Sequence, residues 1–147
     1  MFLKLKRLKA TENIDIVFID YLQLMKPDKQ LENNQVNVAS ISRELKKIAK
    51  MLKIPVVALA QVNRNSEQNS ITSPPKVSDL RESGSIEADA DCVMLLYQPP
   101  SKPNSLDVIV GKNRFGATGT VNLNWNKGIG TMSNSTSKED QKSIYEI

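Results

Sequence analysis

Polar side chains that could contact a phosphate or a metal ion follow three apolar runs of this sequence. Asp20 ends the run IDIVFID, Gln61 follows PVVALA, and Lys112 and Arg114 follow LDVIVG. A carboxylate at a strand tip can hold Mg²⁺ through ordered water, and an amide can hydrogen-bond a phosphate or an attacking water. Two nearby cations suit a terminal phosphate, because arginine presents a planar fork and lysine a point charge. These residue types indicate nucleotide chemistry.

Each of these positions also has a purely structural interpretation. Many buried strands end in an aspartate that accepts a turn hydrogen bond, which is the commoner role for a residue placed like Asp20. Gln61 could equally cap its loop, and Lys112 with Arg114 could form a solvated basic hairpin. The hydrophobic residues before Asp20 match the Walker B pattern of nucleotidases, but single positions leave both interpretations open.

Apolar periodicity predicts the elements that must position these side chains. Two helices are expected, over residues 2–9 and 38–52, and the second should end at Ile54-Pro55 because proline cannot extend a helix. Expected strands cover residues 14–20, 55–60, 92–97, 106–111 and 120–125. The almost unbroken apolar runs at 14–20 and 55–60 predict strands covered on both faces, whereas TVNLNW alternates in the manner of a half-exposed strand. The order favours an α/β fold, a parallel sheet finished by antiparallel strands at one edge.

Three further segments are predicted to be irregular. Residues 61–78 are polar and are expected to form a long surface loop. KNRFGATG should be a loop from which Lys112 and Arg114 project together, with neighbouring glycines keeping its backbone flexible. Residues 133–147 are polar and are expected to form a frayed, disordered tail after a domain that covers residues 1–132.

Composition excludes several classes of site. At 147 residues and 39% hydrophobic, the chain has the size of one domain with a real core. The absence of histidine and the single cysteine exclude Cys/His zinc sites and histidine acid–base chemistry. A net charge of +4 is compatible with a polyanionic partner without requiring one. With neither a secretory signal nor a membrane-spanning run, a reducing, cytoplasmic setting is expected.

Four longer blocks together resemble one known family. They are VFIDYLQLM, ISRELKKIAKMLKIPVVALAQVNR, SDLRESGSIEADADCVMLLY and KNRFGATGTVNLNW. In this order and spacing they closely resemble the C-terminal motor domain of the bacterial replicative DNA helicase, the DnaB type, over about Lys4 to Met132. The string DLRESGSIE is the most specific, because other RecA-like ATPases share the Asp-tipped strand without it.

The resemblance implies a RecA-like fold and a homo-hexameric ring that hydrolyses ATP with Mg²⁺ at subunit interfaces. Such a ring moves on single-stranded DNA and unwinds duplex DNA at the replication fork, with a primase and a helicase loader as further partners. Asp20 matches the Walker B aspartate near Mg²⁺, and Gln61 matches the residue that senses the γ-phosphate. Lys112 and Arg114 match the basic pair offered to the neighbouring subunit's nucleotide, with Arg114 as the arginine finger.

The resemblance also assigns a DNA-binding loop. Arg81, Glu82 and Gly84 match the loop that lines the channel of the ring and holds the DNA backbone. Gly84 is expected to let a main-chain N–H approach a phosphate, in a conformation with positive φ that a branched side chain would resist. Glu82 is expected to orient Arg81 or a neighbouring subunit. Glu87, Asp89 and Asp91 are expected only to cap and solubilise a short helix.

The sequence lacks the P-loop G-x-x-x-x-G-K-S/T, since Gly111-Lys112 is followed by Asn113 and lacks the first glycine. Without that loop no backbone cradle holds the phosphates. The family's catalytic glutamate and collar domain would also lie upstream of Met1. Two functions therefore stay open. The chain is the C-terminal part of a replicative helicase, inactive without the P-loop portion, or a truncated product that binds DNA or a helicase ring without hydrolysing ATP.

Overall fold

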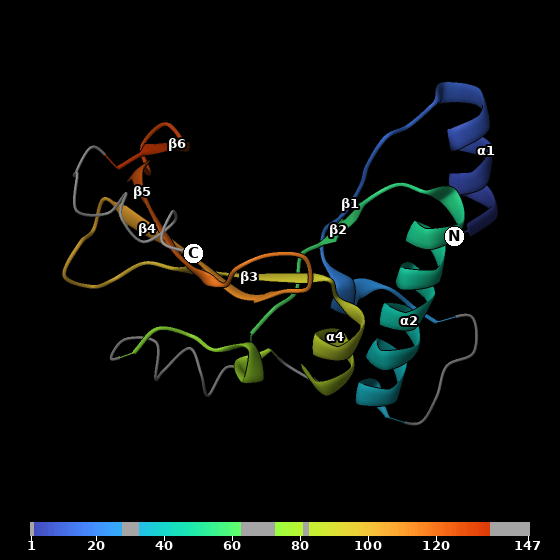
Figure 1. Cartoon of the computed structure of the whole chain (residues 1–147), viewed down its shortest axis with the longest axis horizontal. Helices are drawn as coiled ribbons and strands as arrows, with labels where there is room; N and C mark the ends of the chain where they lie inside the picture. Colours follow the sequence, from blue (N-terminus) through green and yellow to red (C-terminus); the bar gives the residue numbers. More distant parts are fainter. Residues whose placement is uncertain (1, 28–32, 63–72, 81–82, 136–147) are drawn as a thin grey trace. The chain divides into compact units, whose positions relative to one another are not determined.

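A computed structural model describes residues 2–27, 33–62, 73–80 and 83–135 of the chain (Figure 1). These residues form two compact units. The first comprises Met1–Gln61 and Leu80–Ala90, and the second comprises Val62–Asp79 and Asp91–Ile147. Within the described ranges, no helix combines the length and the apolarity needed to cross a membrane.

Helix α2 (Asn34–Leu52) supplies much of the core of the first unit. The side chains of Val38, Ile41, Leu45 and Ile48 recur at three- and four-residue spacing and are buried, Ile48 completely. This stripe packs against α4 (Ser83–Asp89), which lies beside α2 in Figure 1, and against the 3-10 turn η1 (Leu22–Leu24). The predicted helix is confirmed, beginning four residues earlier than expected.

Both ends of α2 are closed by local hydrogen bonds. Asn33 caps the first turn, because its side-chain oxygen accepts a hydrogen bond of 2.8 Å from the Gln35 N–H. At the other end Lys53 has left-handed backbone angles, and the N–H of Ile54 donates to the Ala49 carbonyl at 3.2 Å. Pro55 follows directly, so the helix ends where the sequence predicted.

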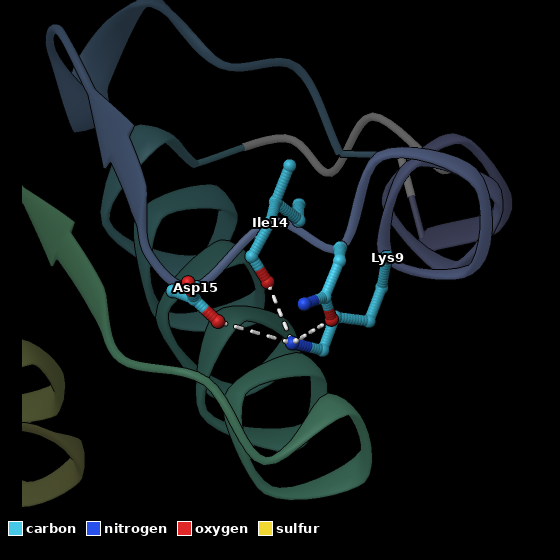
Figure 2. Close-up of polar contacts among 4 residues, drawn as sticks. Lys9, Ile14 and Asp15 are labelled. Atoms are coloured by element: carbon cyan, nitrogen blue, oxygen red, sulfur yellow. Dashed lines mark hydrogen bonds and ion pairs between the residues drawn. The ribbon is translucent and has the colours of Figure 1, made fainter.

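Helix α1 (Phe2–Glu12) is joined to the next segment by one lysine (Figure 2). The Nζ of Lys9 donates to the Ile14 carbonyl at 2.8 Å and to Asn13 Oδ1 at 3.3 Å, and lies 3.4 Å from Asp15 Oδ1. Three oxygens around one ammonium group fix the direction in which the chain leaves the helix. From here the chain runs extended into the first strand.

Strands β1 (Val17–Ile19) and β2 (Val56–Ala58) form a two-stranded parallel sheet in the first unit. Val17 pairs with Val56, and Ile19 pairs with Ala58. The expectation that both strands are covered on both faces is wrong for this chain, because Phe18 is 71% exposed and its partner Val57 is also exposed. The apolar runs were identified correctly, but nothing in the described chain covers their second face.

The second unit is built on a four-stranded antiparallel sheet with the order β3-β4-β5-β6. Its strands are β3 (Cys92–Tyr97), β4 (Ser105–Asn113), β5 (Gly119–Asn126) and β6 (Thr131–Asn134), preceded by the 3-10 turn η2 (Val77–Asp79). Strand β6 includes two residues that were expected in the tail, and residues from 136 onward lie outside the described ranges. The α/β class is confirmed, but the described parallel and antiparallel strands form separate sheets.

Strand β3 is buried on one face only. Val93 and Leu95 are buried, whereas Met94 and Leu96 are each 62% exposed. The β3–β4 register shifts between Val93 and Met94, which leaves Gly111 of β4 without a cross-strand partner. A Cβ at Gly111 would lie 2.5 Å from the Cγ2 of Val77, so the bulge needs a residue without a side chain.

Candidate nucleotide site

The parallel pairing of β1 and β2 brings two predicted site residues to the same edge of the sheet. Asp20 directly follows β1 and is exposed, and Gln61 lies three residues after β2 and is also exposed. The strand ends stay paired beyond the sheet itself, because the N–H of Leu59 donates to the Ile19 carbonyl at 2.9 Å. The N–H of Leu22 in turn donates to the Leu59 carbonyl at 2.8 Å. Asp20 and Gln61 therefore both follow the carboxyl-terminal ends of paired parallel strands, where ligands bind in open α/β sheets.

Gln23 holds the backbone of Gln61 from both sides, a role that sequence reasoning missed. Its Nε2 donates to the Gln61 carbonyl at 3.2 Å, and its Oε1 accepts from the Gln61 N–H at 3.3 Å. One primary amide can do both because it carries a donor and an acceptor side by side. The side chain of Gln61 takes no part in these two bonds, so it can interact with a ligand while its backbone is held. A polar residue inside the apolar string YLQLM was the available signal.

Lys112 and Arg114 lie in the second unit, and the predicted common loop is only partly correct. Lys112 belongs to β4, pairs with Val93 across the ladder and is half-buried. Arg114 is the first residue after the strand and begins the turn that leads to β5. The basic pair therefore sits at the end of a hydrogen-bonded ladder, which restricts the motion of its backbone more than a flexible loop would.

Asp91 lies opposite Arg114 and contacts it twice. The β3–β4 ladder pairs Cys92 with Asn113, and one step further the N–H of Arg114 donates to the Asp91 carbonyl at 2.8 Å. The guanidinium Nη1 lies 3.4 Å from Asp91 Oδ1, with the two side chains 49% and 41% exposed. The expectation that Asp91 only caps a helix is therefore incomplete. An acid directly before one strand and a cation directly after its hairpin partner were the missed signal.

Asn113 shapes the turn that carries Arg114. Its Oδ1 accepts a hydrogen bond of 3.2 Å from the Phe115 N–H, and its Nδ2 donates to the Ala117 carbonyl at 3.2 Å. A Cβ at Gly116 would come within 2.9 Å of that Nδ2, so the asparagine side chain fills the inside of the turn. Hydrogen bonds between residues of the turn therefore stabilise its conformation.

In the described part of the chain, the candidate ligands for a metal ion are single carboxylates. Among the residues that the structure describes, no group of three cysteine or acidic side chains could enclose an ion. Asp20 alone at a strand end fits Mg²⁺, which keeps most of its water and is commonly bound by one or two carboxylates together with phosphate oxygens. The donor set therefore fits a nucleotide-bound magnesium ion and no dedicated metal cage.

The predicted DNA-binding residues are described only in part. Arg81 and Glu82 lie outside the described residues. Gly84 is the second residue of α4 and is exposed, and a Cβ there would meet nothing within 4 Å. Its expected positive φ is wrong, because among the described glycines only Gly130 has one, at 66°. The first turn of a helix, rather than a left-handed bend, sets its backbone.

Comparison with known proteins gives one family for nearly the whole chain. Residues 1–134 match the DnaB-like helicase C terminal domain. The replicative DNA helicase DnaB of Mycobacterium leprae is 45% identical over 126 residues, which cover 82% of this chain and 21% of that protein. The chain therefore spans about a fifth of that relative's length.

Two solved structures have the same fold. One is the structure of an ATPase domain, with a TM-score of 0.80 and 38% identity, covering 91% of this chain and 50% of that one. The other is a DnaB-like replicative helicase studied for its interactions with primase, with a TM-score of 0.81 and 36% identity. It covers 91% of this chain and 34% of that one.

Removing the Gln23 amide should loosen the backbone of Gln61. In the Gln23→Ala variant, amide hydrogen exchange at Gln61, measured by NMR on the 147-residue chain, should be faster by roughly two- to tenfold, the effect of one lost hydrogen bond. Gln98→Ala is the matched control, because that amide binds the Pro103 carbonyl in the other unit. Equal exchange at Gln61 in wild type and Gln23→Ala would show that the observed bonds do not hold this backbone.

Proposed function

Because the chain belongs to the family of DnaB-like helicase C-terminal domains, we propose that it forms the C-terminal part of an ATP-dependent replicative helicase motor. The motor translocates on single-stranded DNA and unwinds the duplex at the replication fork. The observation that carries this proposal is the division of polar groups between two structural contexts. Asp20 and Gln61 share one sheet edge, and Lys112 and Arg114 end a separate ladder.

Asp20 and Gln61 act on the nucleotide of their own subunit. Asp20 would hold Mg²⁺, which would supply charge neutralisation for the phosphates. Gln61, its backbone held by Gln23, directs an amide to the γ-phosphate or the attacking water. The phosphate cradle itself comes from a P-loop, a motif that these 147 residues do not contain. Turnover therefore requires a P-loop supplied outside this sequence.

Lys112 and Arg114 act on the nucleotide of the neighbouring subunit in a homo-hexameric ring. A guanidinium offers five N–H donors in a rigid fork, and the half-exposed side chain of Arg114 leaves surface for an incoming phosphate. A ring with shared sites hydrolyses ATP only once it is assembled. A basic pair that serves the adjacent site couples turnover to ring assembly, which is what a catalytic ring component requires.

Single-stranded DNA binds at the segment around Arg81, Glu82 and Gly84. The open space beside the main chain of Gly84 supports close approach of a phosphodiester backbone, which is read without regard to base sequence. We place the complete ring in the cytoplasm, where a primase and a helicase loader are its further partners. The DnaB-like helicase studied for its interactions with primase supports a primase as one of these partners.

Arg114→Ala is the substitution that tests the proposed catalysis. In a helicase ring whose subunits contain this sequence, it should lower kcat for ATP by about 10³-fold or more, with and without single-stranded DNA. Nucleotide affinity should change much less than kcat, because an arginine finger mainly stabilises charge that develops in the transition state. Steady-state turnover and equilibrium binding of a fluorescent nucleotide measure the two quantities.

Lys127→Ala is the control for loss of a surface cation, since Lys127 stacks on Trp125 at the β5–β6 turn. It should leave turnover unchanged. If Arg114→Ala kept wild-type kcat, the assignment of Arg114 as an arginine finger would be wrong.

Gly84→Ala should separate the stability of α4 from its DNA contact. Alanine favours a helix over glycine by up to about 1 kcal/mol, and open space surrounds the added methyl group, so the free energy of unfolding should stay equal or rise. Binding of single-stranded DNA by the ring should nevertheless weaken by roughly three- to tenfold for every base composition, because the methyl group holds a phosphate off the main chain. Unfolding curves and fluorescence anisotropy provide the comparison. Unchanged DNA affinity would remove Gly84 from the interface.

A further inference from the structure

At the end of the β3–β4 ladder, Arg114 contacts Asp91 through both its backbone and its side chain. The backbone of Arg114 is bound to the backbone of Asp91, and the guanidinium lies beside the Asp91 carboxylate. Residues opposite each other in an antiparallel pair project to the same face of the sheet, so the ladder register itself places the two side chains together. The turn beyond is closed by Asn113.

We infer that Asp91 is a positioning residue for Arg114, holding the guanidinium in a narrow range of conformations until the neighbouring subunit's nucleotide takes it over. This inference rests on the proposed function, in which Arg114 acts on that nucleotide. It adds a residue that touches neither nucleotide nor metal and acts only through the arginine.

The strength of the pair suits this role. An arginine side chain loses considerable rotamer entropy when it is immobilised, and a neighbouring carboxylate bears part of that cost before the phosphate arrives. The pair is nevertheless about half exposed, and ion pairs with that exposure are weak. A nucleotide phosphate carries more charge and accepts two parallel N–H bonds, so it can displace the carboxylate. Asp91 thus restrains Arg114 without trapping it.

The alternative is that Asp91 only stabilises the end of the hairpin. That role depends on the main-chain carbonyl of residue 91, which every substitution at this position retains. A substitution that changes only the side chain of Asp91 therefore distinguishes the two roles. Asp91→Asn keeps the size and an acceptor oxygen but removes the charge.

The test uses a helicase ring whose subunits contain this sequence. Asp91→Asn should lower kcat for ATP by roughly three- to tenfold and change KM by less than about twofold, because positioning affects the transition state and not nucleotide binding. Asp91→Ala should lower kcat at least as much. The matched control is Asp107→Asn, which removes an acid of the same sheet that binds Asn122 and lies away from Arg114. It should leave kcat unchanged.

The double variant decides whether Asp91 acts through Arg114. In an Arg114→Ala background, Asp91→Asn should cause no further loss of kcat, since the group it positions is gone. The same three- to tenfold loss in both backgrounds, or a kcat for Asp91→Asn equal to that of Asp107→Asn, would overturn the inference. If Arg114→Ala itself kept normal turnover, the proposed function would fail and the positioning role with it. Thermal unfolding of each variant reports any separate loss of stability.

Discussion

The parallel pairing of β1 with β2 is the constraint on which the nucleotide-facing half of the site depends. Parallel neighbours need a crossover, and α2 provides it by burying Val38, Ile41, Leu45 and Ile48 in the first unit. Once the strands are paired, the chain segments beyond them lie side by side. Asp20 and Gln61 therefore lie at the same edge of the sheet. Gln23 then extends that order by one more pair of hydrogen bonds. The site is thus positioned by core packing.

A second ladder performs the corresponding task for the basic residues. Its register brings Arg114 opposite Asp91, and a one-residue slip would separate them and turn every side chain of β4 to the other face. The bulge at Gly111 is part of that register, and Val77 leaves no room there for a Cβ. Each unit therefore carries one half of the proposed chemistry on its own backbone scaffold.

Much of this architecture could be predicted from local sequence, and the failures have physical causes. The end of α2 followed from Ile54-Pro55, and the run CVMLLY gave β3 with its observed bounds. Apolar runs report hydrophobicity but not what covers a strand, so the exposure of Phe18 was missed. The pairing of Asp91 with Arg114 depends on contacts between strands, which no single segment encodes. The polar residues after the apolar runs were found from the sequence itself, whereas their specific roles and the DNA-binding residues came from family resemblance and stay predictions.

The most direct test of the central claim, that Arg114 serves the nucleotide of a neighbouring subunit, is turnover in rings assembled from two inactive variants. Asp20→Ala and Arg114→Ala subunits are mixed in equal amounts, so that some interfaces pair an intact Asp20 with an intact Arg114. The account predicts that ATP turnover recovers to roughly a quarter of the wild-type rate, the fraction of such interfaces in random mixtures. No recovery above either variant alone would mean that both residues act within one subunit, and would contradict the account.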